Sequence, residues 1–187
     1  AKPPPWEWAC HLGVYEGPLQ AHLYKLKFEG RRQFAKPLGT LLGHALCKQR
    51  RLPRDTIVVP VPLHARRLRA RGYNQAELLA QACAGAVRRP CVAGALVRHK
   101  DTAVQATLRI SERMSNLRNA FSVRAPNLVR QRFVLLVDDI FTTGATASAA
   151  TIALLRAGAR GVGVACAAVA VAERDLLPLV QNAEYVE

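Results

Sequence analysis

Short apolar runs alternate with helix-spaced patterns along this chain of 187 residues, which is long enough for one full-sized core. Three apolar runs predict buried strands, over residues 56–62, 133–137 and 161–172. Apolar residues three or four positions apart predict helices over residues 19–28, 32–47 and 74–89, and a further helix from the turn near residue 144 to about residue 158. A short strand is predicted over residues 94–98. This order is typical of an α/β fold.

The N-terminal part has a different pattern from the rest. Residues 1–8 are Pro-rich and predict an extended lead-in, and the two helices that follow lie before the first strand. We therefore expect an N-terminal helical extension over residues 1–54, packed on an α/β domain over residues 55–187.

The most informative stretch joins the strand over residues 133–137 to the helix that follows. Asp138 and Asp139 stand where that strand should end, and the hydroxyl-rich turn carries Gly144. Free amides at a helix N-terminus form a phosphate seat, and neighbouring carboxylates accept hydrogen bonds from sugar hydroxyls or bind a divalent metal. The stretch predicts a sugar-phosphate site. The alternative is a strand, an acidic turn and a capped helix without a ligand.

Charge is distributed unevenly along the chain. Residues 1–132 hold 24 basic and 7 acidic side chains, whereas residues 133–187 hold 3 and 6. One cationic cluster lies between the first two predicted helices and comprises Lys25, Lys27, Arg31 and Arg32. The other follows the first strand in a predicted basic loop and comprises Arg66, Arg67, Arg69 and Arg71. The imbalance predicts a polyanionic ligand; the alternative is a solvated Arg-rich surface.

The five cysteines are odd in number and never spaced as CxxC, which argues for reduced thiols, a cytoplasmic protein and no zinc site in this chain. The longest apolar run, residues 162–172, is too short to span a membrane. The polar stretch over residues 100–119 predicts either a flap over a site or a surface loop and helix.

The segment VLLVDDIFTTGAT, residues 134–146, resembles the phosphoribosyl-pyrophosphate (PRPP) motif of type I phosphoribosyltransferases. The resemblance implies a type I phosphoribosyltransferase-like fold with a mostly parallel sheet flanked by helices. It also implies that Asp138 and Asp139 hold the ribose hydroxyls. The 5-phosphate would be cradled by Thr142, Thr143, Gly144, Ala145 and Thr146.

Further segments resemble the ComF family of competence proteins: residues 24–28, 60–64 and 67–77, with the PRPP-like unit. That family is associated with import of single-stranded DNA in natural transformation, so the resemblance implies DNA-import proteins as partners. ComF proteins usually begin with a zinc ribbon carrying two CxxC pairs. This chain has none and no initial Met, and we expect it to begin just after such a ribbon.

The chemistry implied is displacement of pyrophosphate at C1 of PRPP. Mg²⁺ would be held by Asp138, Asp139 and PRPP itself, and the arginines at positions 66, 67, 69 and 71 would stabilise the leaving pyrophosphate. Thr142 stands where purine-salvage enzymes carry an Asp that assists deprotonation of the base, which argues against purine salvage. No residue identifies the acceptor.

Two hypotheses therefore stay open: a Mg²⁺-dependent phosphoribosyltransferase of unknown acceptor, and a non-catalytic PRPP sensor or single-stranded DNA-binding protein. Candidate DNA contacts are the cluster Lys25, Lys27, Arg31 and Arg32. Candidate flap or DNA contacts are Arg98, Lys100, Gln105, Arg109 and Arg113. The sequence predicts no oligomeric state.

Overall fold

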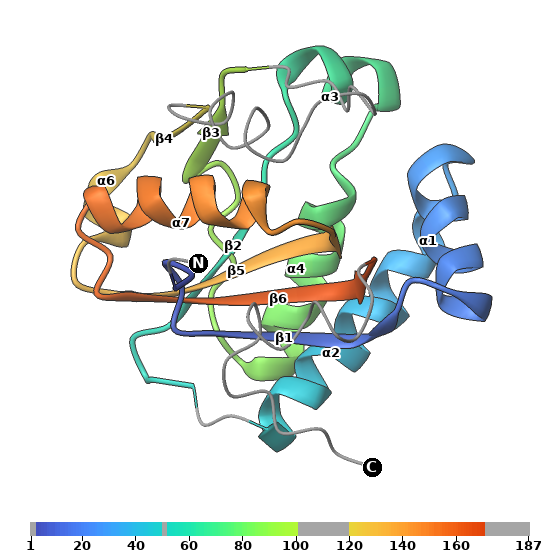
Figure 1. Ribbon diagram of the computed structural model, residues 1–187, viewed down its shortest axis with the longest axis horizontal. Helices are drawn as coiled ribbons and strands as arrows, with labels where there is room; N and C mark the ends of the chain where they lie inside the picture. The colour runs from blue at the N-terminus through green and yellow to red at the C-terminus, as the bar shows by residue number, and fades with distance from the viewer. Residues whose placement is uncertain (1–2, 50–51, 101–119, 171–187) are drawn as a thin grey trace.

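The computed structural model describes residues 3–49, 52–100 and 120–170. Its centre is a four-stranded, all-parallel sheet in the order β1-β6-β5-β2 (Figure 1). The strands are β1 (Trp8–Val14), β2 (Ile57–Pro60), β5 (Phe133–Phe141) and β6 (Gly161–Val169). Both inner strands are almost wholly apolar because they are covered on both faces, as strands of parallel sheets are.

Strand β1 is a feature that the sequence pattern did not predict. Its residues lay partly in the predicted lead-in, but they pair with β6 from Trp8↔Gly163 to Val14↔Val169. Trp8 is buried on one face of the sheet and Ala9 on the other, so the strand alternates as a sheet strand must. The edge of the sheet is therefore built from the N-terminal segment.

Helices cover both faces of the sheet. On one face lie α1 (Gly17–Phe28), α2 (Ala35–Gln49), which follows a 3₁₀ turn η1 (Arg32–Phe34), and α4 (Gln75–Val87). On the other face lies α7 (Ala145–Arg156). Helices α2 and α4 approach closely because Gly39 has no side chain: a Cβ there would lie 2.4 Å from the Leu79 carbonyl oxygen. The predicted helices and the α/β class are confirmed.

Two predictions from the sequence are wrong, one about where a strand ends and one about a loop. Strand β5 does not end before Asp138; it continues through both carboxylates to Phe141, because β6 pairs with it as far as Phe141↔Val169. The predicted basic loop is helix α3 (Ala65–Arg71). Its N-cap is His64, whose Nδ1 accepts a hydrogen bond from the Arg66 amide, and it ends at Gly72 in the left-handed conformation.

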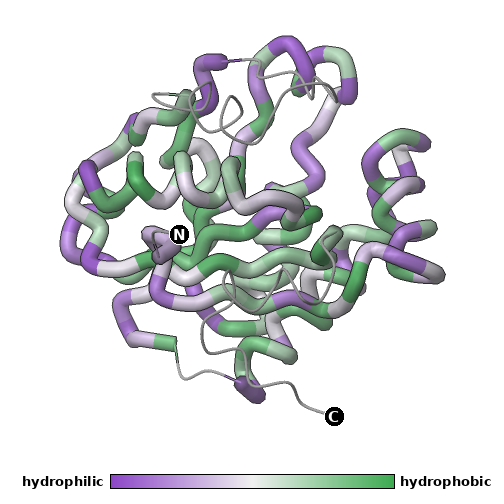
Figure 2. Tube along the Cα trace, viewed as in Figure 1, coloured by the Kyte–Doolittle hydropathy of each residue, from purple (hydrophilic) through white to green (hydrophobic). Residues whose placement is uncertain are grey.

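The predicted strand near residue 94 is β3 (Leu96–Arg98), which forms an antiparallel pair with β4 (Phe121–Val123). A short helix α6 (Pro126–Val129) leads into β5. Residues on both sides of the predicted boundary at residue 54 share one core, since α1 and α2 pack with β2 and α4. Figure 2 shows hydrophobic colour along the central strands and hydrophilic colour on α3. The predicted closing segment from residue 175 lies outside the described residues.

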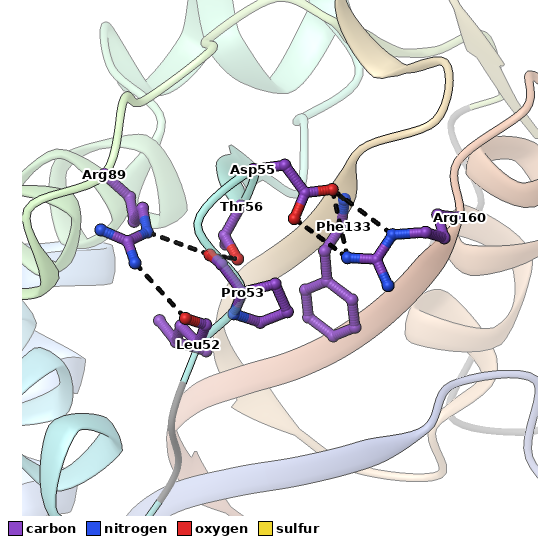
Figure 3. Close-up of polar contacts among 7 residues, drawn as sticks. All are labelled: Leu52, Pro53, Asp55, Thr56, Arg89, Phe133 and Arg160. Atoms are coloured by element: carbon purple, nitrogen blue, oxygen red, sulfur yellow. Dashed lines mark hydrogen bonds and ion pairs between the residues drawn. The ribbon is translucent and has the colours of Figure 1, made fainter.

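The amino ends of β2 and β5 are tied together by a polar cluster (Figure 3). Arg160 donates to both carboxylate oxygens of Asp55, at 2.9 and 3.1 Å, and Asp55 also accepts from the amide of Phe133. Arg89 donates to the carbonyl oxygens of Leu52 and Pro53. These hydrogen bonds hold the segments that lead into β2 and β5 at the amino end of the sheet.

Candidate functional site

The candidate site lies at the carboxyl ends of β2 and β5. From β2 the chain passes through α4 to Cys91, which bridges Val58 on the outer side of β2. From β5 it passes through α7 to β6 on the opposite side. The connections thus leave these neighbouring strands in opposite directions, and open α/β sheets bind ligands at such a switch point. Pairing with β2 ends at Pro60↔Val137, so β5 extends beyond its neighbour into this region.

The loop from β5 to α7 carries the predicted phosphate cradle. Gly144 is buried with φ 71° and is the N-cap of α7, where a glycine supplies no side-chain cap. The Ser148 amide donates to the Gly144 carbonyl, and the Ala145 amide donates weakly to Thr143 Oγ1 at 3.4 Å. The first turn of α7 holds no acidic residue. Helix amides and the positive end of the helix dipole thus converge on the turn from Thr142 to Thr146, as an anion site requires.

Two packed aromatic rings support this loop. Trp6 meets Phe141 edge to face with ring centroids 5.7 Å apart, and both rings are buried. A Cβ on Gly144 would lie 2.8 Å from Phe141 Cζ and 3.1 Å from Trp6 Cη2. The loop can keep its shape only with glycine at this position. The contribution of Trp6 could not be read from the Pro-rich lead-in.

The two carboxylates of the motif are neighbours at the end of β5 and interact with each other through their side chains. Asp138 is half-buried and directly follows the buried apolar residues of β5. Its Oδ1 accepts a hydrogen bond from the amide of Asp139 at 2.8 Å. Burial, with the nearby charge of Asp139 as the second cause, raises the pKa of Asp138 well above its usual range. An electropositive ligand group or a cation beside it would relieve this cost.

Asp139 lies on the face covered by α1 and α4, and its side chain is only 7% exposed. Its Oδ2 is 3.3 Å from Nζ of Lys27, at the end of α1, and accepts a hydrogen bond from Nε2 of Gln75 at 3.1 Å. The Oε1 of Gln75 accepts in turn from Nη1 of Arg71, at the end of α3. One carboxylate thus connects three helices. Sequence reasoning assigned no role to Gln75, although a polar residue directly after the helix cap Asn74 was a signal for one.

Because α3 is a helix, its four arginines fall into two pairs that differ in burial. Arg67 and Arg71 are four residues apart and share the partly buried face of α3, whereas Arg66 and Arg69 are exposed. Only the first pair turns toward the body of the protein. The expectation that all four arginines serve one pyrophosphate stays a prediction.

The cluster at the end of α1 is divided in a similar way. Lys27 turns inward to Asp139, while Lys25, Arg31 and Arg32 are exposed. The Arg32 guanidinium lies over the ring of Tyr73 at 4.5 Å, and the Tyr73 hydroxyl donates to the Leu26 carbonyl. Two large aromatic side chains accompany these cations on α1. They are Tyr24 and Phe28, 50% and 61% exposed, with ring centroids 5.0 Å apart.

The remaining predicted flap or DNA contacts are Arg98 and Lys100, which the structure describes, and three residues that it does not describe. Arg98 sits over the ring of Phe121 at 5.5 Å and its Nε donates to the Lys100 carbonyl. Gln105, Arg109 and Arg113 lie outside the described residues.

A magnesium ion fits the donor chemistry here. Among the described residues no group of three or more His, Cys, Asp and Glu side chains is arranged to hold a metal. Mg²⁺ is commonly bound by one or two carboxylates together with substrate phosphates, which matches an acid pair beside a phosphate cradle. The predicted Mg²⁺ ligands, Asp138 and Asp139, stay a prediction.

Comparison with curated proteins identifies the family. DNA utilization protein YhgH of Escherichia coli K12 is 37% identical over 168 residues, which cover 88% of this chain and 73% of that protein. Competence protein F of Haemophilus influenzae is 35% identical over 147 residues, covering 76% and 64%. The chain belongs to the ComF family. Competence protein ComFC of Bacillus subtilis matches this ComF chain at 33% identity over 103 residues, 54% of the chain and 39% of that protein. No protein-family model matches the chain.

Solved structures confirm the type I phosphoribosyltransferase-like fold of this ComF-family chain. Glutamine PRPP amidotransferase from B. subtilis, complexed with ADP and GMP, aligns with a TM-score of 0.50 at 18% identity. A structure described as the allosteric regulatory enzyme of purine biosynthesis aligns with a TM-score of 0.51 at 19% identity. Each alignment covers 77% of this chain but only 30% of the larger one. Within the described residues, no helix combines the length and apolar character needed to cross a bilayer.

Proposed function

We propose that this ComF-family protein binds PRPP with Mg²⁺ and transfers its phosphoribosyl group to an acceptor within DNA uptake or utilization. The observation that carries the proposal is the juxtaposition of the α7 N-terminus with Asp138 at the switch point of the sheet. The names of the relatives, DNA utilization protein and competence protein, support the biological setting.

In this proposal the turn from Thr142 to Thr146 binds the 5-phosphate through helix amides and hydroxyls. The carboxylate pair of β5 holds the ribose and thereby fixes C1 for attack, which turns an encounter into an effectively intramolecular step. Bound Mg²⁺ would neutralise charge on the pyrophosphate oxygens. Breaking the bond from C1 to the pyrophosphate oxygen leaves negative charge on the leaving group, which Arg67 and Arg71 would stabilise.

Calorimetric titration of PRPP with Mg²⁺ tests the proposal. We expect binding to the wild type and a loss on the order of 100-fold for Asp138→Asn, which keeps the size and the hydrogen-bond acceptor but removes the charge. Lys36→Gln, an exposed substitution on α2, is the matched control and should bind like the wild type. A wild type that does not bind PRPP would overturn the proposal. Where PRPP binds, pyrophosphate release in the presence of candidate acceptors distinguishes an enzyme from a sensor.

A second candidate function, binding of single-stranded DNA, is favoured by the exposed aromatic pair on α1. Stacking on aromatic rings beside cations is how proteins bind single strands without sequence preference, and each stacked base contributes about 1–3 kcal/mol. Tyr24 and Phe28 stand among Lys25, Arg31 and the Arg71 guanidinium, which lies 5.9 Å from the Phe28 ring. Tyr73, by contrast, is buried and not available for stacking.

Fluorescence anisotropy with a labelled oligothymidylate tests this second function. The double variant Tyr24→Ala/Phe28→Ala should weaken binding about tenfold or more, and affinity should fall steeply with salt. Leu41→Ala removes an equally exposed apolar side chain from α2 and should leave binding unchanged. Equal affinity of both variants would rule out the aromatic pair as the binding surface.

A further inference from the structure

The acid pair at the end of β5 already has a cation beside it, and the inference drawn from this cation rests on the proposed PRPP site. Nζ of Lys27, near the end of α1, lies 3.3 Å from Oδ2 of Asp139. The charge of Lys27 also acts on Asp138: burial and the charge of Asp139 raise the pKa of that carboxyl, and Lys27 works in the opposite direction. One ammonium therefore supplies positive charge to both carboxylates of the motif.

We propose that Lys27 is a further binding residue of this site, which compensates the acid pair in the free protein and moves to the pyrophosphate oxygens when PRPP and Mg²⁺ bind together. In the free protein its ammonium repels a lone divalent cation from the carboxylates. PRPP brings negative charge of its own, so the ammonium gains a new partner as it leaves both acids to the sugar and the metal. Metal binding without PRPP is thereby disfavoured.

The ammonium can move because the backbone of Lys27 is anchored while its side chain is flexible. Leu26 beside it is fully buried, and the Leu26 carbonyl accepts a hydrogen bond from the Tyr73 hydroxyl, so the end of α1 is held in place. The Lys27 side chain is 28% exposed. Its four-carbon stem lets the charge shift without any movement of the helix.

Asp139 keeps its orientation when the ammonium leaves, because it has other partners. Its Oδ1 accepts a hydrogen bond from the Ile140 amide at 2.9 Å, and its Oδ2 accepts one from Nε2 of Gln75 at 3.1 Å. Gln75 is buried, and its own Oε1 accepts from Arg71. A carboxylate has about four lone-pair positions, so these neutral partners leave Asp139 able to accept from a ribose hydroxyl. The amides orient the acid, while Lys27 supplies the charge that is exchanged.

The same contacts explain why the pyrophosphate is the new partner of Lys27. Arg71, which the proposed function assigns to the pyrophosphate, reaches Asp139 through Gln75. Lys27 and Arg71 thus approach one carboxylate from the ends of α1 and α3. A pyrophosphate beside this carboxylate would meet cations from two helices, and hydrogen bonds between charged groups are the strong ones.

Binding of a divalent metal without PRPP tests the proposal by a readout that does not depend on turnover. Mn²⁺ is suited to the same oxygen ligands as Mg²⁺, and electron paramagnetic resonance measures the free ion. Lys27→Gln should bind Mn²⁺ about tenfold or more tightly than the wild type, because the repelling charge is gone. Lys27→Arg keeps the charge and should exclude the ion as the wild type does. Adding Asp139→Asn to Lys27→Gln should abolish the gain, and the exposed control Lys36→Gln should match the wild type.

The same variants are then titrated with PRPP and Mg²⁺ by calorimetry, after melting curves without ligand have shown that they are folded. Lys27→Gln should bind PRPP about tenfold more weakly despite its gain for the metal alone, because the polyanion has lost a cation. A lower melting temperature with both affinities unchanged would reduce Lys27 to a structural ion pair and overturn the proposal, as would tighter PRPP binding by Lys27→Gln. A wild type that fails to bind PRPP would refute the proposed function and the move to pyrophosphate. The Mn²⁺ titration is independent of PRPP and shows on its own whether Lys27 compensates the acids.

Discussion

The two ends of the parallel sheet are built for opposite purposes. At the amino end, Asp55 accepts hydrogen bonds from the Arg160 guanidinium and the Phe133 amide. Arg89 donates to two carbonyl oxygens of the segment that leads into β2. At the carboxyl end, Asp138 is half-buried beside the like charge of Asp139, and the charge of Lys27 offsets only part of this cost. Polar side chains at the amino end thus hydrogen-bond to one another and stabilise the fold, whereas the carboxylate at the carboxyl end keeps an unfavourable charge that a ligand could compensate.

The carboxylates at the two ends shift their pKa in opposite directions. The Arg160 guanidinium is the main cause that lowers the pKa of Asp55, while burial raises the pKa of Asp138. The first shift means that the folded state favours the charged form, and the second that it disfavours it. A site that must later hold a cation or sugar hydroxyls is therefore less stable when empty than it would be with a neutral side chain, a usual feature of functional sites.

The largest effect is expected from Gly144→Ala at the carboxyl end. The new methyl group would enter the space of Phe141 and Trp6, and alanine is strained at φ 71°. We expect a loss of about 2–4 kcal/mol of unfolding free energy, measured by urea denaturation, and a loss of PRPP binding in the folded fraction.

Gly94→Ala is the matched control for this prediction. Gly94 also has a positive φ, of 79°, but nothing lies within 4 Å of a Cβ built there. It should therefore show the backbone strain alone, about 1–2 kcal/mol. Equal losses in the two variants would mean that packing of the aromatic pair does not shape the phosphate loop.

The next effect concerns the pH dependence that Asp138 imposes. Because its pKa is raised in the folded protein, the unfolded chain releases this proton first as the pH rises above about 3.8. Stability therefore falls from that pH toward the raised folded pKa. Asp138→Asn should remove this fall, so the variant should melt above the wild type near neutral pH and gain little near pH 4. Melting curves over a pH series measure it; a variant with the same pH profile as the wild type would contradict the shift.

The smallest effect is expected from Asp55→Asn at the amino end. Asp55 and Arg160 are both substantially exposed, so their pair contributes little and is screened by salt. The lowered pKa of Asp55 gives a contribution that is present above about pH 3.8 and lost as the pH falls through the folded value. We expect a slight drop in melting temperature at neutral pH that disappears at low pH and at high salt. A drop as large as that of Gly144→Ala would reverse the comparison of the two ends.

Much of the fold and of the motif could be predicted because the information is local. The apolar run before Asp138, the glycine of the turn and the helix that follows are each encoded by neighbouring residues. The cap of α4 is equally local, since the Asn74 side chain accepts from the amide of Ala76 two residues on.

Other features depended on partners far along the chain. Strand β1 forms because β6 offers it a free edge, and β5 passes its acids because β6 continues beside it. Whether the arginines after β2 lie in a loop or a helix decides which of them face inward, and the spacing of charges alone does not show that.

The sequence alone determined that a strand, two acids, a phosphate-type turn and a helix follow one another, because each is specified within a few residues. The tertiary structure alone decided what surrounds the acids: Lys27 and Gln75 reach Asp139 from two other helices, at 3.3 and 3.1 Å. The order of these residues is local, but only the packing of distant helices determines which side chains approach the acids.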